Sequence, residues 1–375
     1  MARINGARIC EVAWEQVCRP KEEGGLGFRN ILVMNQALML KHLWKLIQND
    51  RKSIWADWII KYRLHKKTLW TFHCSTGSWG WKKMIKLSPF FQRGLQYKVD
   101  GLYFQLWQDI WHERGPLCVS YPQGPNVTGL PIDTLLSRVM RHGQWNWPTS
   151  TDPDFNELAT QLPPIYANRP DQIVWRTRSG RFSTQFAYSL FQPNRTKVEW
   201  HTLLHDRYKI PKHTFILWLA ILEKLSTMDK FWISHGDIGC VLCDGQFVES
   251  HDHLFFKCQY SKRCLSLVQR QVRFQWPIYD WQQGISWANK RWRSHHLFNT
   301  ASRALLAALA YHLWMERNNR KFNNTGTTAD SIAHQIIEDI RLRIMIDECN
   351  PNLQTIALSR IWKIAWPNAH LAHSL

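Results

Sequence analysis

Residues 240–258 read CVLCDGQFVESHDHLFFKC and place three cysteines and one histidine in the spacing C-x2-C-x9-H-x4-C. The two-residue gap lets a tight turn bring the sulfurs of Cys240 and Cys243 to one metal ion, and His253 and Cys258 can complete a tetrahedron. Thiolate ligands favour Zn²⁺ over Mg²⁺ or Ca²⁺. Because three thiolates and one imidazole leave no open position on the ion, the segment predicts one structural Zn²⁺ and no reaction at the metal.

Two alternatives stay open at this motif. His251 lies two residues before His253 and can replace it as the ligand, while Asp252 or the spare histidine can orient the ligand ring. The spacing can also be a coincidence in a chain with 9 cysteines and 17 histidines. Both halves of the motif nevertheless have the gap that a zinc site needs, which favours the metal interpretation.

The balance of charge indicates a polyanionic partner. The 375 residues are enough for two or three domains and carry a formal charge of +19. Residues 1–100 contain 18 Lys/Arg against 7 Asp/Glu, whereas residues 197–270 contain 10 against 8. We therefore expect nucleic acid, RNA or DNA, to bind the N-terminal portion, unless the basic residues only keep the fold soluble. The candidate phosphate contacts are Lys61, Arg63, Lys66, Lys67, Lys82 and Lys83.

The 22 tryptophans recur at helix-like spacings beside Leu, Ile and Phe, which favours core packing over stacking on bases. The cysteines outside the motif show no pairing pattern, which is typical of a reducing compartment. They are Cys10, Cys18, Cys74, Cys118, Cys264 and Cys349. The N-terminus lacks a signal-peptide pattern, and the sequence has no uninterrupted run of about 18 apolar residues. We expect an intracellular protein of the nucleus or cytoplasm that is neither secreted nor in a membrane; its oligomeric state is not indicated.

Hydrophobic periodicity predicts a mostly α fold with a small β element in the middle third. Helices are expected over 31–47, 53–62, 298–322 and 328–346 because apolar residues recur every three or four positions. Residues 171–187 predict a strand, a Ser-Gly turn at 179–180 and a second strand entering a helix. The cluster Gly24, Gly25 and Gly27 indicates a plain turn, because no Gly-Lys-Ser/Thr follows it.

The order of these motifs resembles the C-terminal region of plant non-LTR (LINE-type) retrotransposon reverse transcriptases, and residues 183–265 resemble their zinc-binding domain. The residues that carry the likeness there are FSTQFAY (182–188), Trp200, IPKHTFILWLAILEKLST (210–227), CVLC (240–243), and Glu249 and Ser250 before His253, Leu254, Phe255 and Cys258. The flanking motifs are WEQVCRPKEEGGLGFRN (14–30), NQALMLKHLWK (35–45) and HLWMERNNRKF (312–322).

The resemblance implies four segments. Residues 1–75 would be a basic helical segment like the one after the polymerase thumb, and 76–182 an irregular mixed connector. Residues 183–265 would be the zinc-binding domain, and 266–375 a C-terminal helical region. The family also implies an origin in a plant transposable element and a role for the zinc region in handling nucleic acid.

The expected function is that of a noncatalytic, zinc-binding C-terminal fragment that binds nucleic acid. A polymerase holds two metal ions with carboxylates, and this sequence has no Asp-Asp pair. The alternatives are a tryptophan-rich scaffold that binds a protein partner and a retroelement remnant without function. An enzyme is the least favoured hypothesis. His312 and Glu316, four residues apart on a predicted helix, are interpreted as a surface contact.

Overall fold

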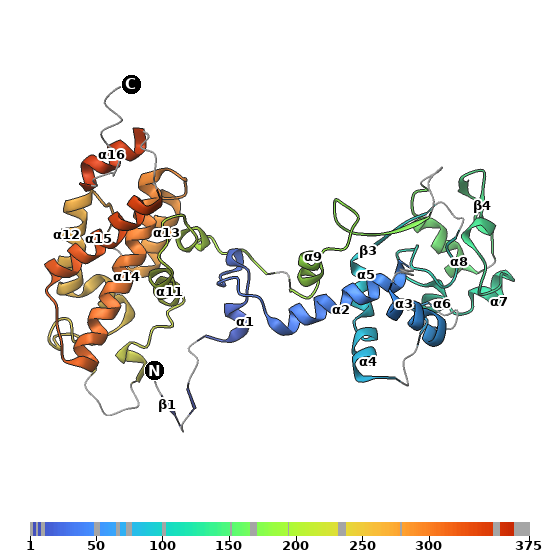
Figure 1. The fold of residues 1–375 in the computed structure, drawn as a ribbon, viewed down its shortest axis with the longest axis horizontal. Coiled ribbons are helices and arrows are strands. Elements are labelled where there is room, and N and C mark those ends of the chain that lie inside the picture. The colour runs from blue at the N-terminus through green and yellow to red at the C-terminus, as the bar shows by residue number, and fades with distance from the viewer. Residues whose placement is uncertain are drawn as a thin grey trace. The chain divides into compact units, whose positions relative to one another are not determined.

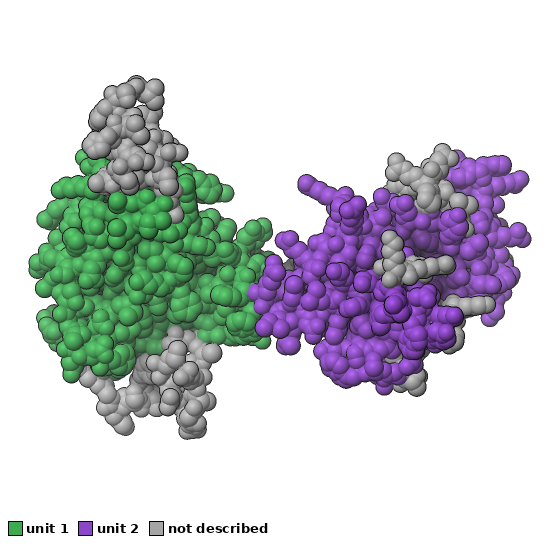
Figure 2. All heavy atoms as spheres, in the orientation of Figure 1, with its two compact units in different colours: residues 1–28, 195–375 green, residues 29–194 purple. Residues whose placement is uncertain are grey.

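The computed structural model describes residues 3–4, 7–8, 12–48, 53–64, 68–72, 77–99, 103–150, 152–165, 171–193, 195–231, 238–277, 280–347 and 353–363. These residues form two compact units, one made of residues 1–28 and 195–375 and the other of residues 29–194 (Figure 2). The first, unit 1, therefore contains both the N-terminal segment and the complete cysteine motif. The second, unit 2, contains the residues in between.

Unit 1 is almost entirely helical. Its long helices are α11 (Pro211–Ile221), α12 (Gln259–Val272), α13 (Trp281–Arg291), α14 (Leu297–Asn323), α15 (Ala329–Asp347) and α16 (Leu353–Trp362) (Figure 1). Its short elements are β1 (Arg3–Ile4), β2 (Ala7–Arg8), α1 (Trp14–Val17), α10 (His201–Leu204), the 3₁₀ turns η1 (Lys21–Glu23) and η5 (Met228–Phe231), and the π turn η6 (His253–Lys257).

Helix α14 is the central element of unit 1. It packs against α11 and α15, and α15 also packs against α12. Residues 305–310, which read LLAALA, are all buried, so no side of the helix at this level faces water. A helix that is apolar all round is stable only inside a core, and its small alanines let neighbouring helices approach closely.

The N-terminal segment of unit 1 is tied to α11 through a glycine turn. The indole N–H of Trp218, a buried residue, donates a 2.9 Å hydrogen bond to the carbonyl of Gly24. Gly24 has a φ of 83°, and a Cβ there would lie 3.1 Å from the ring of Trp200. Gly25 leaves no room either, since a Cβ would lie 2.1 Å from the Arg19 carbonyl oxygen. The prediction of a plain turn is confirmed.

Unit 2 contains shorter elements. Its helices are α2 (Ile31–Ile47), α3 (Ile54–Ile59), α4 (Trp79–Ile85), α5 (Ser88–Arg93), α6 (Leu117–Ser120), α7 (Gly124–Thr128), α8 (Pro153–Leu158) and α9 (Thr184–Ser189). A π turn, η2 (Ile60–Leu64), and two 3₁₀ turns, η3 (Leu136–Val139) and η4 (Ala159–Gln161), lie between them. Its strands are β3 (Leu95–Lys98), β4 (Met140–Arg141), β5 (Gln144–Trp145) and β6 (Gln172–Trp175).

Trp175 organises the core of unit 2. Strand β6 pairs antiparallel with β3, with Leu95 opposite Trp175, and the indole is fully buried. The rings of Trp44, Phe91 and Phe182 pack around it with centroid separations of 5.7, 5.6 and 4.9 Å. Aromatic side chains bury large apolar areas, so this one residue joins α2, α5 and the β3–β6 pair.

The fold-class prediction is confirmed, because the described residues are mostly helical with a few short strands. The expected helices at 31–47, 298–322 and 328–346 correspond to α2, α14 and α15. The second strand expected after the Ser-Gly turn at 179–180 is wrong. Phe182 packs on Trp175 there instead, and β6 takes β3 as its partner. Of the four predicted segments, the first and third each contribute residues to both units; as family domains the four stay predictions.

Half of the described tryptophans are buried and only Trp14, Trp58 and Trp79 are exposed, which supports core packing as their main role. Cys18, Cys118 and Cys264 form no disulfide, while Cys10, Cys74 and Cys349 lie outside the described residues. Among the helices that the structure describes, none combines the length and apolar character needed to cross a bilayer. The compartment stays a prediction.

Replacing Gly94 by alanine should destabilise unit 2, because a Cβ at this position would lie 2.4 Å from the buried Trp175 ring. We expect the free energy of unfolding to fall by about 1–3 kcal/mol, as for other overpacked cores. Gly80→Ala in α4 is the control, since nothing lies within 4 Å of its added Cβ. Urea denaturation followed by tryptophan fluorescence compares the two, and equal stabilities would contradict the packing described.

Candidate metal centre

The first half of the cysteine motif is a tight turn held by its own backbone. The N–H of Cys240 donates to the carbonyl of Phe247 at 2.8 Å, and the N–H of Gly245 donates back to the carbonyl of Cys240 at 3.0 Å. Asp244 and Gly245 have φ values of 55° and 77°. Both residue types adopt the left-handed region readily, which lets the chain reverse immediately after Cys243.

The second half is a single π turn followed by a helix. His253 begins η6, and the N–H of Cys258 donates a 2.7 Å hydrogen bond to the carbonyl of His253. Cys258 is then the residue that precedes the first turn of α12. The four-residue gap between the two therefore spans one wide turn, which places both side chains on the same side of the backbone.

The four side chains meet at one point. The ligand atoms of Cys240, Cys243, His253 and Cys258, the Cys3His group, all lie within 4.8 Å of one another. The Sγ of Cys243 is 3.4 Å from the Nε2 of His253, and all four residues are buried. Zinc binds thiolate at about 2.3 Å and imidazole at about 2.0–2.1 Å, so donor atoms this close can surround one ion. The group can hold one metal ion, and its donor set is that of structural zinc.

Electrostatics prepare one of the thiols for the metal. The pKa of Cys258 is lowered to about 5, first by the hydrogen bond from the Cys240 thiol and then by the backbone N–H groups of Ser261 and Tyr260 at the start of α12. The pKa of Cys240 is raised by the same hydrogen bond and by burial, and burial raises the pKa of Cys243. Metal binding must release the protons that these two thiols keep.

His253, and not His251, belongs to the Cys3His group. His251 packs its ring against Phe255 and Trp281 at centroid separations of 5.0 and 4.8 Å. Asp252 accepts a hydrogen bond from the N–H of Trp281 and forms an ion pair with Lys257. His251 and Asp252 therefore attach the cysteine motif to Trp281 of α13, and Asp252 also pairs with Lys257 of η6. Among these contacts of the described residues, none joins either residue to the ring of His253.

A buried ion pair fastens the loop to α14. Glu249 is fully buried, and its carboxylate accepts hydrogen bonds from the Nε and Nη2 of Arg317 at 3.0 and 2.7 Å. The same carboxylate accepts the N–H of Met228 at 3.0 Å, and Arg317 Nη2 lies 3.4 Å from the carbonyl of Ser226. A two-pronged pair of this kind is strong only because its remaining hydrogen-bonding capacity is also used.

A second arginine of α14 reaches the metal turn itself. The Nη1 of Arg320 lies 3.4 Å from the carbonyl oxygens of both Val241 and Leu242, the residues between the first two cysteines. Glu316 accepts from the Nε of Arg320 at 2.8 Å and from the N–H of Thr327 at 2.8 Å. These contacts give the motif HLWMERNNRKF a structural role. Its residues Glu316, Arg317 and Arg320 hold the loop that contains the cysteine motif against α14.

The interpretation of His312 and Glu316 as a surface contact is wrong. Glu316 is only 1 % exposed and supports Arg320, while His312 lies 2.9 Å from the carboxylate of Asp339 on α15. Sequence reasoning also missed Arg317 and His213. The one available signal was the run of buried apolar residues before Glu316, which identifies α14 as a core helix whose polar residues need partners.

The candidate phosphate contacts lie in unit 2. Lys61 and Arg63 belong to η2, and Lys82 and Lys83 to α4; Lys66 and Lys67 fall outside the described residues. A Cβ at Gly77, just before α4, would lie 3.9 Å from the Nη2 of Arg63, so the two segments adjoin. None of these four cations forms an ion pair within the part of the chain that the structure describes.

Exposed aromatic rings alternate with these cations. Trp58 and Tyr62 lie 5.8 Å apart and are about half exposed, and Lys61 lies over the Tyr62 ring. Trp79 is 73 % exposed, with the ammonium of Lys83 4.6 Å from its ring centroid. Cations beside exposed aromatic rings are the combination that single-stranded nucleic acid binds.

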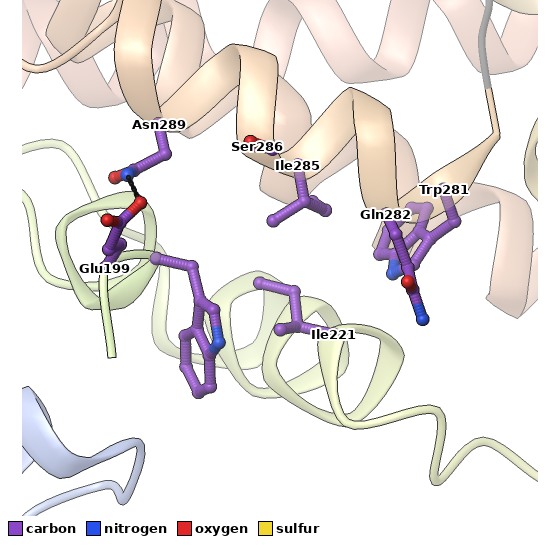
Figure 3. A pocket seen from close by; sticks show the side chains of 8 residues that line it. Glu199, Ile221, Trp281, Gln282, Ile285, Ser286 and Asn289 are labelled. Atoms are coloured by element: carbon purple, nitrogen blue, oxygen red, sulfur yellow. Dashed lines mark hydrogen bonds between the residues drawn. The ribbon is translucent and has the colours of Figure 1, made fainter. Parts of the chain in front are cut away.

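Unit 1 also has a pocket of about 310 Å³ beside α13. Figure 3 shows Ile221 of α11 opposite Ile285 and Trp281 of α13, with Asn289 hydrogen-bonded to Glu199 at one end. Trp281 is the ring on which His251 packs, so one wall of the pocket is continuous with the residues that support the zinc loop.

Comparison with known proteins supports the interpretation of the cysteine motif as a zinc-binding site. The family described as zinc-binding in reverse transcriptase matches residues 182–264. The chain is 27% identical over 300 residues to an Arabidopsis thaliana protein named "Putative ribonuclease H protein", a match that covers 72% of the chain and 46% of that protein. It is 32% identical over 112 residues to an uncharacterized mitochondrial protein of Arabidopsis thaliana, covering 28% of the chain and 71% of that protein. The chain thus spans about half of the longer relative; no solved structure matches it.

Cys243→Ser should remove the cobalt spectrum of the Cys3His group. Metal-free protein titrated with Co²⁺ is expected to show an intense thiolate-to-cobalt absorption, and the serine variant should lose most of it because a buried hydroxyl replaces one thiolate. His253→Ala should weaken the same band. His251→Ala is the control and should keep the band at full strength, because His251 packs on Trp281 and not on the metal turn. Loss of the band in His251→Ala alone would contradict the ligand geometry.

Arg317→Met should destabilise unit 1 by about 3–5 kcal/mol, because it leaves the carboxylate of Glu249 buried and unpaired. The matched control is Arg263→Met on α12, whose pair with Asp330 is exposed and should contribute less than about 1 kcal/mol. Urea denaturation followed by circular dichroism measures both. Equal losses of stability from the two variants would show that the buried Glu249–Arg317 pair contributes no more than an exposed one.

Proposed function

This chain belongs to a reverse transcriptase-related protein family, and we propose that it is the noncatalytic, zinc-binding C-terminal part of a LINE-type retrotransposon reverse transcriptase that binds nucleic acid. In this proposal Cys240, Cys243, His253 and Cys258 are the ligands of one structural zinc ion. The bound ion would fix the segment from Cys240 to Cys258, and the metal itself would carry out no reaction because its four positions are filled.

One observation carries the assignment to a reverse transcriptase tail. Two motifs separated by about sixty residues, the cysteine motif and HLWMERNNRKF, meet through the Glu249–Arg317 pair and through Arg320 on the metal turn. Each motif resembles its counterpart in the retrotransposon family, and their mutual contacts join the two into one structural unit. The matched family and the greater length of the "Putative ribonuclease H protein" relative support a module that acts as part of a longer protein.

We assign nucleic-acid binding to the basic and aromatic surface of unit 2 formed by α3, η2 and α4. Lys61, Arg63, Lys82 and Lys83 would contact phosphates, and the exposed rings of Trp58, Tyr62 and Trp79 would stack on bases. Their lack of ion-pair partners among the described residues leaves their charge available to a polyanion. The formal charge of +19 adds a general attraction that such a surface would focus.

Binding of single-stranded RNA or DNA should weaken steeply with salt. If about five phosphates are contacted, the logarithm of the affinity plotted against the logarithm of salt concentration should have a slope of about −3.5 to −4.5. Fluorescence anisotropy with a labelled oligonucleotide measures this slope. An affinity that does not change with salt would exclude the electrostatic surface.

The double variant Lys82→Glu/Lys83→Glu tests the location. It should reduce the magnitude of the slope by about 1.4–1.8, because two phosphate contacts are lost. The control is Lys262→Glu/Arg263→Glu on α12, which makes the same change of charge on two exposed residues of unit 1. Equal losses from both pairs would indicate only a diffuse attraction. No retention on nucleic acid by the unmodified chain would favour the alternative of a tryptophan-rich scaffold for a protein partner.

A further inference from the structure

Three helices of unit 1 bring two histidines and an aspartate together away from the cysteine motif. His213 lies in the first turn of α11, His312 in the second half of α14 and Asp339 in the second half of α15. Their ligand atoms all lie within 4.8 Å of one another. The Oδ2 of Asp339 is 2.9 Å from the Nε2 of His312 and 3.3 Å from the Nε2 of His213.

His213 is an unusual residue for a helical core. It is only 1 % exposed, and neither of its ring nitrogens forms a hydrogen bond within the described residues; the approach to Asp339 lacks hydrogen-bond geometry. The ring of Tyr311 packs on it at a centroid separation of 4.4 Å. A buried polar group without a partner costs about 1–3 kcal/mol. The packing therefore keeps the His213 imidazole buried at a cost in folding free energy, and a ligand bound to its ring nitrogen would remove that cost.

Both imidazoles favour the neutral form, which is the form that binds metal. Burial lowers the pKa of His213 to about 4, assisted by the neighbouring His312, and burial also lowers the pKa of His312. The ammonium of Lys212, which lies 5.0 Å from the Tyr311 ring centroid, also lowers the pKa of both histidines. Two neutral rings thus offer lone pairs beside one carboxylate.

We propose that His213, His312 and Asp339 form a second metal site, which binds one Zn²⁺ or a similar divalent transition-metal ion through two imidazole nitrogens and a carboxylate oxygen. Donors at about 2.0–2.1 Å from a tetrahedral ion lie about 3.3 Å apart, close to the 2.9 and 3.3 Å between the Asp339 oxygen and the two imidazole nitrogens. The side chain of Asp339 is 34% exposed and that of His312 12%, so the site opens to solvent on this side and water can fill the remaining position.

The bound ion would join α11, α14 and α15. These are the helices that make up the centre of unit 1, and α14 also contains Arg317 and Arg320, which contact the cysteine motif. The site differs in chemistry from the Cys3His group, because it contains no sulfur and keeps an open position. It would therefore bind more weakly and exchange its ion faster.

Titration of the metal-free 375-residue chain with Co²⁺ tests the proposal, because cobalt reports sulfur and nitrogen–oxygen ligands differently. We expect two equivalents to bind: a tight one with thiolate-to-cobalt absorption in the near ultraviolet, and a weaker one that adds only visible ligand-field bands. Asp339→Asn and His213→Gln should each bind one equivalent and keep the thiolate band. That retained band also shows that these variants are folded around the Cys3His group.

The control is His334→Gln on α15, whose side chain is 69% exposed and which should keep both equivalents. Binding of a single equivalent by the unmodified chain would overturn the proposal. So would a second equivalent that survives in Asp339→Asn and in His213→Gln with unchanged affinity, because it would then belong to other residues. Neither result depends on nucleic-acid binding, so this test is separate from that of the proposed function.

Discussion

The buried pair between Glu249 and Arg317 is the interaction on which unit 1 depends. A carboxylate with no solvent exposure is tolerated only if its charge and its lone pairs are satisfied, and here a guanidinium and a backbone N–H do so. The partners come from the cysteine motif and from α14, so this contact fixes where the loop must lie. Metal coordination would then fix the conformation of the cysteine motif, whose position is already set by its contact with α14.

Helix α14 connects several features that the sequence keeps apart. Its apolar first half fills the core, its charged second half holds the metal turn, and His312 faces α11 and α15. One helix thereby links the Cys3His group to the proposed second ion. A change in either site would be felt in the same packed core, because closely packed interiors transmit small displacements.

The division into two units separates two kinds of chemistry. Unit 1 contains the Cys3His group and its supporting ion pairs, and unit 2 contains cations beside exposed rings that have no ion-pair partner among the described residues. Under the proposed function, the metal would stabilise unit 1 and a separate surface on unit 2 would bind nucleic acid. Because the closed donor set leaves no coordination position for a substrate, nucleic acid would be bound by the protein surface and not by the ion.

The sequence by itself determined a donor set of three cysteines and one histidine, the mostly helical fold and the helices α2, α14 and α15. The reason is that ligand spacing within nineteen residues and apolar periodicity are local, so each can be recognised from neighbouring residues. Tertiary structure alone decided that His253 lies in the metal group and His251 against Trp281, since both have suitable spacing.

Tertiary structure also decided the contacts between distant parts of the chain. The partner of β6, the Glu249–Arg317 pair and the meeting of His213, His312 and Asp339 all join residues that are remote in sequence. The N-terminal 28 residues likewise belong with residues 195–375 through contacts such as Trp218 with Gly24. Such contacts depend on how helices pack against one another, and the pattern within a single helix contains no information about its partner.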